Sequence, residues 1–589
     1  MERLYTRWGK VLDKEHPLNE YPRPQMKRDS FINLNGVWKY AILEENKKFS
    51  GYQGDIVVPF SPETILSGVE KTVSPNDILY YQKSFNFTKT NRRVLLHFGA
   101  VDYECTVTLN GKELGSHKGG YFPFTFDVTA AILDGENDLR LAVKDPSNEG
   151  IQARGKQTFK RGQIWYTPQS GIWQTVWLEE VCEDYIESIK LTPDIDNNKL
   201  DIELKFSDRV INECAAMVTD KGEIKAACKI IDGKGSVTLT DYELWSPENP
   251  YLYEIKIAAG DDRIESYFGM RKFSRGLDEN GVPRFMLNNK PYFFNGLLDQ
   301  GYWSDGMYTA PSDEALVYDI QTMKDLGFNT LRKHIKIEPL RWYYHCDRLG
   351  MIVWQDMING GREYNFAAIG VMPFFGLCTT RKQFGRITDG KKHYKFYSRQ
   401  DEDGRKEYYV DSERMIDHLY NVTSLAMWVP FNEAWGQFDS VKACDFYRKK
   451  DPTRLIDHAS GWVDHGAGDV NSFHIYFTPF WFPKYNKNDD RPIGLTEYGG
   501  FSMRPEGHAF NLDKLFGYRI YKTQEKFDSA IKHLFEERVA PAVKKGLSAS
   551  IYTEVSDVED EVNGLLSYDR EVLKVTPEIM KAANEKIKL

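Results

Sequence analysis

Tyr292-Phe-Phe-Asn-Gly-Leu-Leu298 and Asn329-Thr-Leu-Arg332 are two apolar runs of strand length, and Met351-Ile-Val-Trp354 is a third. The residues between them, 313–326 and 338–349, carry the pattern of helices that bury one face. Strands that alternate with helices in this way are typical of parallel α/β units. This stretch therefore predicts a parallel sheet covered by helices.

Five further runs of the same kind follow, at residues 425–431, 454–457, 472–476, 493–496 and 548–553. With the first three they give eight strands, the number that closes a (β/α)8 barrel. We expect residues 276–589 to form this C-terminal TIM barrel. A long segment at 357–410 separates the third strand from its helix, and such excursions in compact domains are usually functional loops. Its glycine, basic and aromatic content suggests a wall of the binding cleft.

The sequence before the barrel has the short alternating runs and turns of β-sandwiches. Between two such runs lies the Asn110-Gly111 pair, a strong hairpin signal because both residues tolerate positive φ. We expect one β-sandwich over residues 1–182 and a second over 183–275, whose size of roughly 90 residues suits an immunoglobulin-like sandwich. The fold class is therefore multidomain, with two β-sandwiches ahead of a barrel.

The amino-acid composition is typical of a globular protein, and the net charge argues against a polyanionic partner. The net charge of −9 over 589 residues argues against a nucleic-acid partner. Seven cysteines, without a C-x-x-C pair, signal neither a disulfide framework nor a zinc site. No secretory signal and no run of ~18 apolar residues is visible. We therefore expect no membrane partner and a cytoplasmic location, or a periplasmic one if a signal peptide had preceded this chain. A homo-oligomer stays open.

Two glutamates point to the chemistry: Glu433 in Ala426-Met-Trp-Val-Pro-Phe-Asn-Glu-Ala-Trp-Gly436 and Glu497 in Pro492-Ile-Gly-Leu-Thr-Glu-Tyr-Gly-Gly500. They follow the fourth and seventh predicted strands, which face each other across the C-terminal mouth of a barrel. A single strand-end glutamate is more often a salt-bridge partner. Two in one mouth supply the acid and the carboxylate that glycoside hydrolysis needs, and a retaining enzyme holds them ~5–5.5 Å apart.

The neighbours of each glutamate suggest its role. Asn432 can hydrogen-bond a sugar hydroxyl, and Trp435 lowers the polarity around Glu433, which favours the protonated acid. Tyr476 could hold Glu497 ionised. The charge of Glu497 would then raise the pKa of Glu433 and split the two like groups into acid and base.

These residues carry a family resemblance that extends over nearly the whole chain. Phe431-Asn-Glu-Ala-Trp435 and Thr496-Glu-Tyr-Gly-Gly500 resemble the acid/base and nucleophile motifs of glycoside hydrolase family 2, which includes β-galactosidases, β-glucuronidases and β-mannosidases. Other segments resemble its sugar-binding jelly-roll domain and its immunoglobulin-like domain: Tyr80-Tyr-Gln-Lys-Ser-Phe85, Val107-Thr-Leu-Asn-Gly-Lys112, Gly119-Gly-Tyr-Phe-Pro-Phe124, Ser170-Gly-Ile-Trp-Gln-Thr-Val-Trp177, Trp245-Ser-Pro-Glu-Asn-Pro-Tyr-Leu-Tyr253 and Phe268-Gly-Met-Arg271.

The resemblance implies a retaining exo-glycosidase with Glu433 as acid/base and Glu497 as nucleophile. Arg332 and His334, in Leu331-Arg-Lys-His334, resemble the family's arginine- and histidine-containing motif at the second strand end, which implies contacts with the nucleophile and with a sugar hydroxyl. Asp299 stands near the family's first-strand motif, although Leu297-Leu-Asp-Gln300 departs from it. The loop at 154–169 is either a structural turn or an arm that reaches the mouth. Further candidate lining residues are Asp356, His474, Tyr476, Trp462, Trp435 and Asn432.

The identity of the sugar stays open at this stage. Beyond Glu497 the Asn-x-Lys motif of the family's β-glucuronidases has no clean match, since Asn511-Leu-Asp-Lys514 has the wrong spacing. The long excursion nevertheless supplies Arg362, Arg381, Lys382 and Arg386. We expect β-galactosides first, then β-glucuronides, β-mannosides or α-L-arabinopyranosides, as free glycosides, oligosaccharides or polysaccharides. No cofactor is expected; some β-galactosidases bind Mg²⁺ near the acid/base, but the pattern for it is not evident.

One alternative of another class is a non-catalytic carbohydrate-binding protein on a hydrolase scaffold. Retention of both glutamates argues against it, because holding two like charges together has an electrostatic cost that binding does not require. No motif of a serine esterase, a zinc protease or a nucleotide enzyme is present in the sequence.

Overall fold

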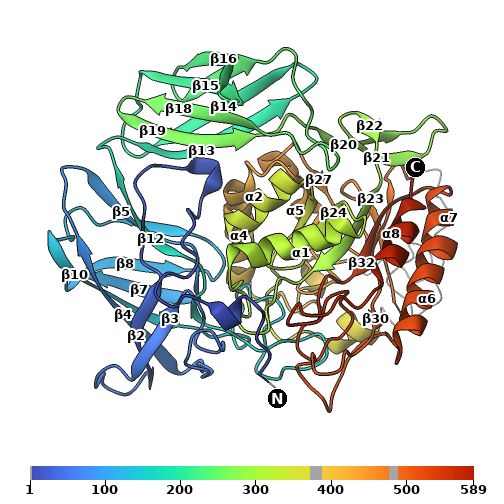
Figure 1. The fold of residues 1–589 in the computed structure, drawn as a ribbon, viewed down its shortest axis with the longest axis horizontal. Coiled ribbons are helices and arrows are strands. Elements are labelled where there is room, and N and C mark those ends of the chain that lie inside the picture. The colour runs from blue at the N-terminus through green and yellow to red at the C-terminus, as the bar shows by residue number, and fades with distance from the viewer. Residues whose placement is uncertain (1–2, 372–387, 477–488) are drawn as a thin grey trace.

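The computed structural model describes residues 3–371, 388–476 and 489–589. Two β-sandwiches lie beside and above a barrel covered by helices (Figure 1). The predicted fold class, a jelly-roll sandwich, an immunoglobulin-like sandwich and a TIM barrel, is confirmed. Within the described ranges no helix is both long and apolar enough to cross a bilayer.

The first sandwich packs a six-stranded sheet of order β3-β2-β4-β10-β7-β8 against a four-stranded sheet of order β1-β12-β5-β9, with a short β11-β6 pair. Its apolar core contains alternate residues of both sheets, such as Leu79 and Tyr81 of β4, which are fully buried. Its strands are β1 (Ile32–Asn33), β2 (Gly36–Glu44), β3 (Gly54–Val58), β4 (Asp77–Phe87), β5 (Arg93–Phe98), β6 (Val101–Asp102), β7 (Glu104–Leu109), β8 (Lys112–Lys118), β9 (Phe124–Asp127), β10 (Gly135–Lys144), β11 (Gly171–Ile172) and β12 (Val176–Val181).

The second sandwich pairs a three-stranded sheet, β13-β14-β17, with a four-stranded sheet, β16-β15-β18-β19. It has a core of its own, formed by alternating residues such as Ile255 and Ile257 of β18. Its strands are β13 (Ile186–Asp194), β14 (Lys199–Phe206), β15 (Cys214–Asp220), β16 (Glu223–Ile230), β17 (Lys234–Thr238), β18 (Tyr253–Ala259) and β19 (Asp262–Phe268).

Eight parallel strands form the barrel in the order β27-β26-β25-β24-β23-β32-β29-β28. In chain order they are β23 (Phe294–Asp299), β24 (Thr330–Lys333), β25 (Ile352–Asp356), β26 (Leu425–Val429), β27 (Leu455–Ile456), β28 (Asn471–Ile475), β29 (Ile493–Gly499) and β32 (Leu547–Thr553). All eight overlap the predicted runs. Glu433 follows the fourth strand, and Glu497 lies within the seventh, two residues before its end. A short β30 (Phe501–Ser502) pairs with β31 (Arg519–Ile520) outside the barrel.

Helices surround the strands, as the alternation of the sequence predicts. They are α1 (Asp313–Asp325), α2 (Leu340–Leu349), α4 (Glu402–Leu419), α5 (Ser440–Lys450), α6 (Gln524–Leu534), α7 (Ala540–Val543) and α8 (Pro577–Glu585). Because α4 begins at Glu402, the predicted excursion at 357–410 extends too far, and its last residues belong to the helix. Residues 372–387 of the excursion, with Arg381, Lys382 and Arg386, lie outside the described residues.

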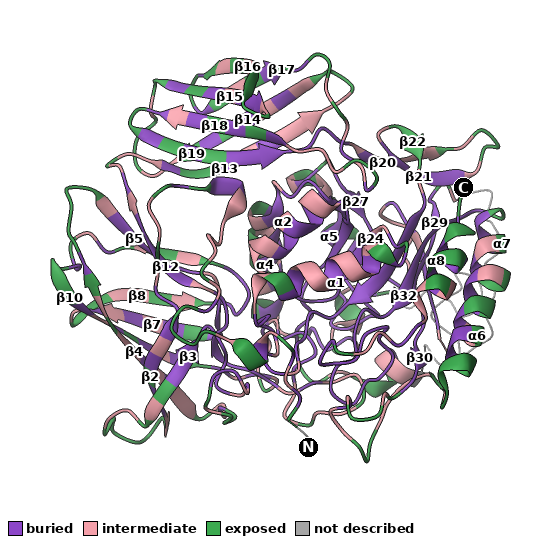
Figure 2. Ribbon diagram, in the orientation of Figure 1, coloured by how far each residue is buried: buried purple, intermediate pink, exposed green. Residues whose placement is uncertain are grey.

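A small hairpin sheet closes the barrel at the end opposite the mouth. It consists of β20 (Phe273–Leu277), β21 (Pro283–Leu287) and β22 (Lys290–Pro291), so the predicted domain boundary at 275 falls inside β20. Phe285 of β21 stacks on Phe294 of β23 at 5.0 Å between ring centroids, and Trp354 of β25 packs edge-on against both. The apolar cluster at this end is buried, whereas β22 at the outer edge of the hairpin is exposed (Figure 2). This packing leaves the carboxyl ends of the strands for polar residues.

Candidate active site

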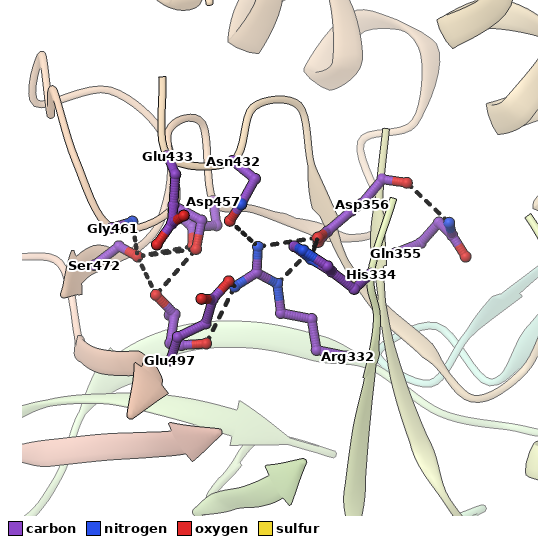
Figure 3. A network of polar contacts seen from close by, with 12 residues as sticks. Arg332, His334, Gln355, Asp356, Asn432, Glu433, Asp457, Gly461, Ser472 and Glu497 are labelled. Carbon is purple, nitrogen blue, oxygen red and sulfur yellow. Dashed lines mark hydrogen bonds and ion pairs between the residues drawn. The ribbon is translucent and has the colours of Figure 1, made fainter. Parts of the chain in front are cut away.

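Arg332, at the carboxyl end of β24, is the centre of a buried polar network (Figure 3). Its guanidinium donates to both carboxylate oxygens of Asp356 at 2.9 and 3.0 Å, to Oε1 of Glu497 at 3.0 Å and to Oδ1 of Asn432 at 2.7 Å. A fourth acceptor is the Thr496 carbonyl at 3.1 Å. The planar fork of arginine suits such a set of acceptors. Arg332 therefore fixes the direction of three predicted site residues at once.

Glu433 lies in a turn after β26, with positive φ at Glu433 (48°) and Ala434 (61°). Positive φ is unusual for residues with a Cβ, and here the Glu433 amide donates to the Ser460 carbonyl at 3.0 Å, which anchors the turn. The carboxyl group lies over the same mouth as Glu497 (Figure 3). The sequence therefore placed both glutamates on the correct face of the barrel.

His474, at the end of β28, lies between the two glutamates. Its Nδ1 is 2.7 Å from Oε1 of Glu433 and 3.3 Å from Oε2 of Glu497, and its Nε2 is 3.1 Å from Oγ of Ser460. One atom of each of the three side chains lies within 4.8 Å of the others. Two carboxyl groups this close match the ~5–5.5 Å spacing of retaining enzymes better than the ~6.5–9.5 Å spacing of inverting ones.

Burial and local charges give the two glutamates different protonation. Burial raises the pKa of Glu433 to about 8, against the opposing charges of Lys156 and Arg332. Burial, with the nearby Glu433 adding to it, also raises the pKa of Glu497, but His474, Arg332 and Tyr476 oppose this change. Burial lowers the pKa of His474 to about 4, so the imidazole is neutral at pH 7. At neutral pH Glu433 therefore carries its proton, and the donors around Glu497 favour its ionised form.

Tyr476 supports Glu497 from the other side. Its hydroxyl donates to Oε2 of Glu497 at 2.8 Å and lies 2.6 Å from Oγ1 of Thr553, at the end of β32. Tyr518 stacks on the Tyr476 ring at 4.1 Å between centroids. Tyr476 was expected to hold Glu497 ionised, and its hydroxyl does contact the Glu497 carboxylate.

Three more of the predicted residues line the same mouth. Nδ1 of His334 is 2.8 Å from Oδ2 of Asp356. Burial is the main cause that lowers the pKa of His334 to about 3, and the charge of Lys156 adds to it, so the ring is neutral. Trp435 lies 6.1 Å from the His334 ring, and Trp462 lies 5.9 Å from the His474 ring. Nδ2 of Asn432 and Nε1 of Trp435 are buried and find no acceptor in the described part of the chain, so both can donate to a bound molecule.

Asp299 corrects one prediction. It pairs with Nζ of Lys333 at 2.7 Å, and Lys333 also binds Glu338 at 2.8 Å. Along β23 the inner residue is Leu298, which is opposite Arg332 in the register, whereas Asp299 is opposite Lys333. Side chains alternate along a strand, so Asp299 points outward to the helices and not into the mouth. The predicted substrate contact of Asp299 is therefore wrong.

Two residues that the sequence reasoning missed also lie near the pair. Lys156, from the loop of the first domain, is 4% exposed, and its charge acts on Glu433, His334 and Glu554. Its ammonium lies 5.7 Å from the Trp435 ring, and no anionic partner within 4.0 Å occurs in the ranges that the structure covers. Glu554 follows β32, and burial raises its pKa well above the usual range, with the charge of Glu561 adding to this. Its position after a buried strand could have revealed Glu554, as it did Glu433.

The loop at 154–169 reaches the barrel. The amides of Arg154 and Gly155 donate to the Asn359 carbonyl at 3.0 and 3.2 Å, and the hydroxyl of Tyr166 donates to Glu561. Of the two interpretations of this loop, a structural turn and an arm toward the mouth, the contacts favour the arm. It delivers Lys156 to the site from a different domain.

Arg362 and the segment from Asn511 to Lys514, both considered for a sugar carboxylate, are engaged in contacts within the protein. Arg362 forms a paired contact with Asp401, at 2.8 Å for both oxygens. Asn511 accepts from the backbone amide of Lys514 at 3.1 Å and donates to Asp560 at 2.9 Å, so this segment is a local turn.

Three sequence families match the chain. Their descriptions are "Glycosyl hydrolases family 2, TIM barrel domain" for residues 281–588, "Glycosyl hydrolase 2 galactose-binding domain-like" for 70–174 and "Glycosyl hydrolases family 2" for 184–271. They divide the chain into the same three parts as the fold.

Individual relatives are distant. A putative β-glucuronidase of Formosa agariphila is 24% identical, over 85% of this chain and 70% of its own length. A β-galactosidase of Thermoanaerobacter pseudethanolicus is also 24% identical, over 55% of this chain and only 44% of its own length. Among solved structures, a β-glucuronidase of an uncultured Clostridium species superimposes with a TM-score of 0.72 at 19% identity, covering 96% of this chain and 99% of that one.

Proposed function

This chain belongs to glycoside hydrolase family 2, and we propose from this that it is a retaining exo-β-glycosidase with Glu433 as acid/base and Glu497 as nucleophile. The observation that carries the proposal is the Glu433–His474–Glu497 group, whose atoms lie within 4.8 Å of one another. The difference in protonation between the glutamates supports it.

The first chemical step breaks the glycosidic bond. Glu433 gives its proton to the leaving oxygen while the Glu497 carboxylate attacks the anomeric carbon, and the sugar becomes bound to Glu497 as an ester. Arg332 at 3.0 Å and Tyr476 at 2.8 Å hold the two oxygens of Glu497, so the attacking group is already aligned. Asn432 is itself held by Arg332. Its Nδ2 has no acceptor among the described residues and can donate to the sugar hydroxyl next to the anomeric carbon.

The second step releases the sugar. Glu433, now ionised, takes a proton from water, and the water oxygen displaces Glu497 from the anomeric carbon. Two inversions at that carbon give overall retention. His474 can take part in neither step as a cation, because burial lowers its pKa to about 4. Its ring is held by Ser460 on one side and contacts both carboxyl groups on the other, so its role is to position them.

For the sugar, we infer a β-linked uronic acid first. Lys156 is a buried cation that faces Glu433 and Glu554 without an anionic partner within 4.0 Å in the described ranges, and a sugar carboxylate would supply one. Burial raises the pKa of Glu554, so this neutral acid would not repel a uronate. This inference places β-linked uronides ahead of the β-galactosides that we expected first from the sequence. The putative β-glucuronidase among the relatives supports this order.

A β-galactoside is the second candidate. Glu554 can also accept or donate hydrogen bonds to sugar hydroxyls, as a neutral sugar requires, and a β-galactosidase is among the relatives. β-Mannosides and α-L-arabinopyranosides follow. We keep as proposals that the protein needs no cofactor and that it works in the cytoplasm, or in the periplasm if a signal peptide had preceded this chain; the homo-oligomer stays open.

A panel of 4-nitrophenyl glycosides tests the proposal. We expect hydrolysis of the β-glucuronide, β-galacturonide or β-galactoside, and proton NMR should show the β-anomer as the first product. Lys156→Met should lower kcat/KM for the uronide by tenfold or more and have a smaller effect on the galactoside. If no β-glycoside is cleaved, or if the α-anomer forms first, the proposed function is wrong.

A further inference from the structure

A cavity of about 630 Å³ lies where the first domain meets the beginning of the barrel excursion. Residues of the loop around Trp165 form one wall, and Tyr364, Phe366 and Ile369 form the other. The walls come from segments about two hundred positions apart in the sequence, so the cavity exists only in the assembled chain.

The two walls are held together by backbone hydrogen bonds. The Arg154 amide donates to Asn359 at 3.0 Å, and the Gly361 amide donates to Ile151 at 3.1 Å. The Arg154 guanidinium donates to the Arg362 carbonyl at 3.1 Å and lies 4.8 Å from the Tyr364 ring. The cavity is therefore preformed, as binding sites for small molecules usually are. Because Arg362 is paired with Asp401, that guanidinium is not available to a ligand anion.

Trp435 connects this cavity to the catalytic pair. Its ring lies 5.4 Å from the Trp165 ring and 6.4 Å from the Tyr364 ring, which is nearly parallel to it at 21°. Trp435 follows Glu433 by two positions. The cavity thus lies on the acid/base side of the mouth. Since the acid/base protonates the departing oxygen, this is the side on which the leaving group sits.

The lining suits a sugar better than an apolar group. Trp165 and Tyr364 are half-buried and Phe366 is 72% exposed, so aromatic faces are open to the cavity. Hydrogen-bonding side chains, among them Asn148 and the exposed Lys160, share the lining. Aromatic faces pack on the C–H faces of sugars while the polar groups bind their hydroxyls.

We propose that this cavity binds the sugar units on the leaving-group side of the cleaved bond, and that the substrate is an oligosaccharide and not a glycoside with a small aglycone. The inference rests on the proposed function, because the leaving-group side is defined by the role of Glu433. It adds to that function a second binding site, contributed partly by the first domain.

The test compares two substrates with the same terminal sugar. One is the 4-nitrophenyl glycoside, and the other is a trisaccharide: β-1,4-galactotriose for a galactosidase, or a trisaccharide capped by β-glucuronic acid for a uronidase. The measured quantity is the ratio of kcat/KM for the trisaccharide to kcat/KM for the nitrophenyl glycoside. Trp165→Ala and Phe366→Ala should each lower this ratio about tenfold, which corresponds to ~1.4 kcal/mol.

Phe49→Ala is the matched control, because Phe49 is an exposed aromatic residue of the first domain that packs on Tyr52 and Tyr80. Its ratio should equal that of the wild type. If Trp165→Ala lowers both substrates equally, or if neither variant changes the ratio, the cavity is not a leaving-group site. Calorimetry can test the same point without turnover. It measures the affinity of the trisaccharide for Glu497→Gln, and this affinity should fall when Trp165→Ala is added. Absence of nitrophenyl glycoside hydrolysis in the wild type would instead contradict the proposed function.

Discussion

Replacing Arg332 by methionine should move the acidic limb of the pH profile of kcat/KM to higher pH. The Arg332 guanidinium is 3.0 Å from Oε1 of Glu497, so the charge centres are ~4 Å apart. At an effective dielectric constant of ~20, two unit charges at this distance attract by about 4 kcal/mol, equivalent to ~3 pKa units. The nucleophile must be ionised, and losing a nearby cation raises its pKa. The limb should therefore shift upward by between ~1 and 3 units.

The same substitution leaves Asp356 without its two bonds to Arg332. Breaking a buried ion pair by removing one partner costs roughly 3–5 kcal/mol, so a loss of stability has to be separated from the electrostatic effect. Arg454→Met is the matched control. Arg454 is also buried and pairs with Asp451 at 3.0 Å, but it precedes β27 at the end of the barrel remote from the mouth.

The assay is initial rates on the best nitrophenyl glycoside from pH 4 to 10, at substrate concentrations below KM. Both variants should unfold at lower temperature, and only Arg332→Met should displace the acidic limb. If Arg332→Met folds poorly, Arg332→Lys keeps the charge and should shift the limb less. An acidic limb that stays at the wild-type pH in Arg332→Met, or that moves equally in Arg454→Met, would refute this account of Glu497.

Four further outcomes follow from the structure. The alkaline limb of kcat/KM should fall near the pKa of about 8 of Glu433, because activity requires the protonated acid and is lost as pH rises through that value; a limb that is unchanged in Glu433→Gln would contradict this. Glu433→Gln should slow substrates with poor leaving groups by 10²–10⁴-fold, and azide should restore turnover of nitrophenyl substrates. Trp354→Ala should destabilise the barrel by about 3–5 kcal/mol because this ring is fully buried, as thermal unfolding would show. Dialysis against EDTA should leave kcat unchanged, and a rate restored only by added Mg²⁺ would mean that the expectation of no cofactor is wrong.

The sequence predicted the barrel and the place of its chemistry because both depend on local patterns. Each of the eight strands is a short buried run, and a carboxylate that ends such a run must lie at one edge of the barrel. Arg332 and Glu497 are 165 positions apart, yet the strand count was enough to bring them to the same mouth. The end of the excursion was misjudged since the pattern of α4 merges with the loop before it.

The direction of Asp299 and the position of Lys156 could not be predicted from local sequence patterns. Asp299 was misplaced because the direction of a side chain depends on the register of the strand, and the apolar run does not show whether Leu298 or Asp299 faces inward. Lys156 belongs to another domain, and nothing in its own neighbourhood shows where domain packing brings its ammonium. Glu554 could have been found by the rule that found Glu433, since it also follows a buried strand.

Trapping the covalent intermediate tests the central claim most directly. A 2-deoxy-2-fluoro glycoside of the preferred sugar, with a dinitrophenyl leaving group, should form the ester quickly and lose it slowly, because fluorine at C2 destabilises the second transition state. Mass spectrometry of a proteolytic digest should then find the sugar on Glu497, with no label in Glu497→Gln. A label on Glu433 or on another residue, or hydrolysis with no trapped ester and an α-anomeric first product, would contradict the account.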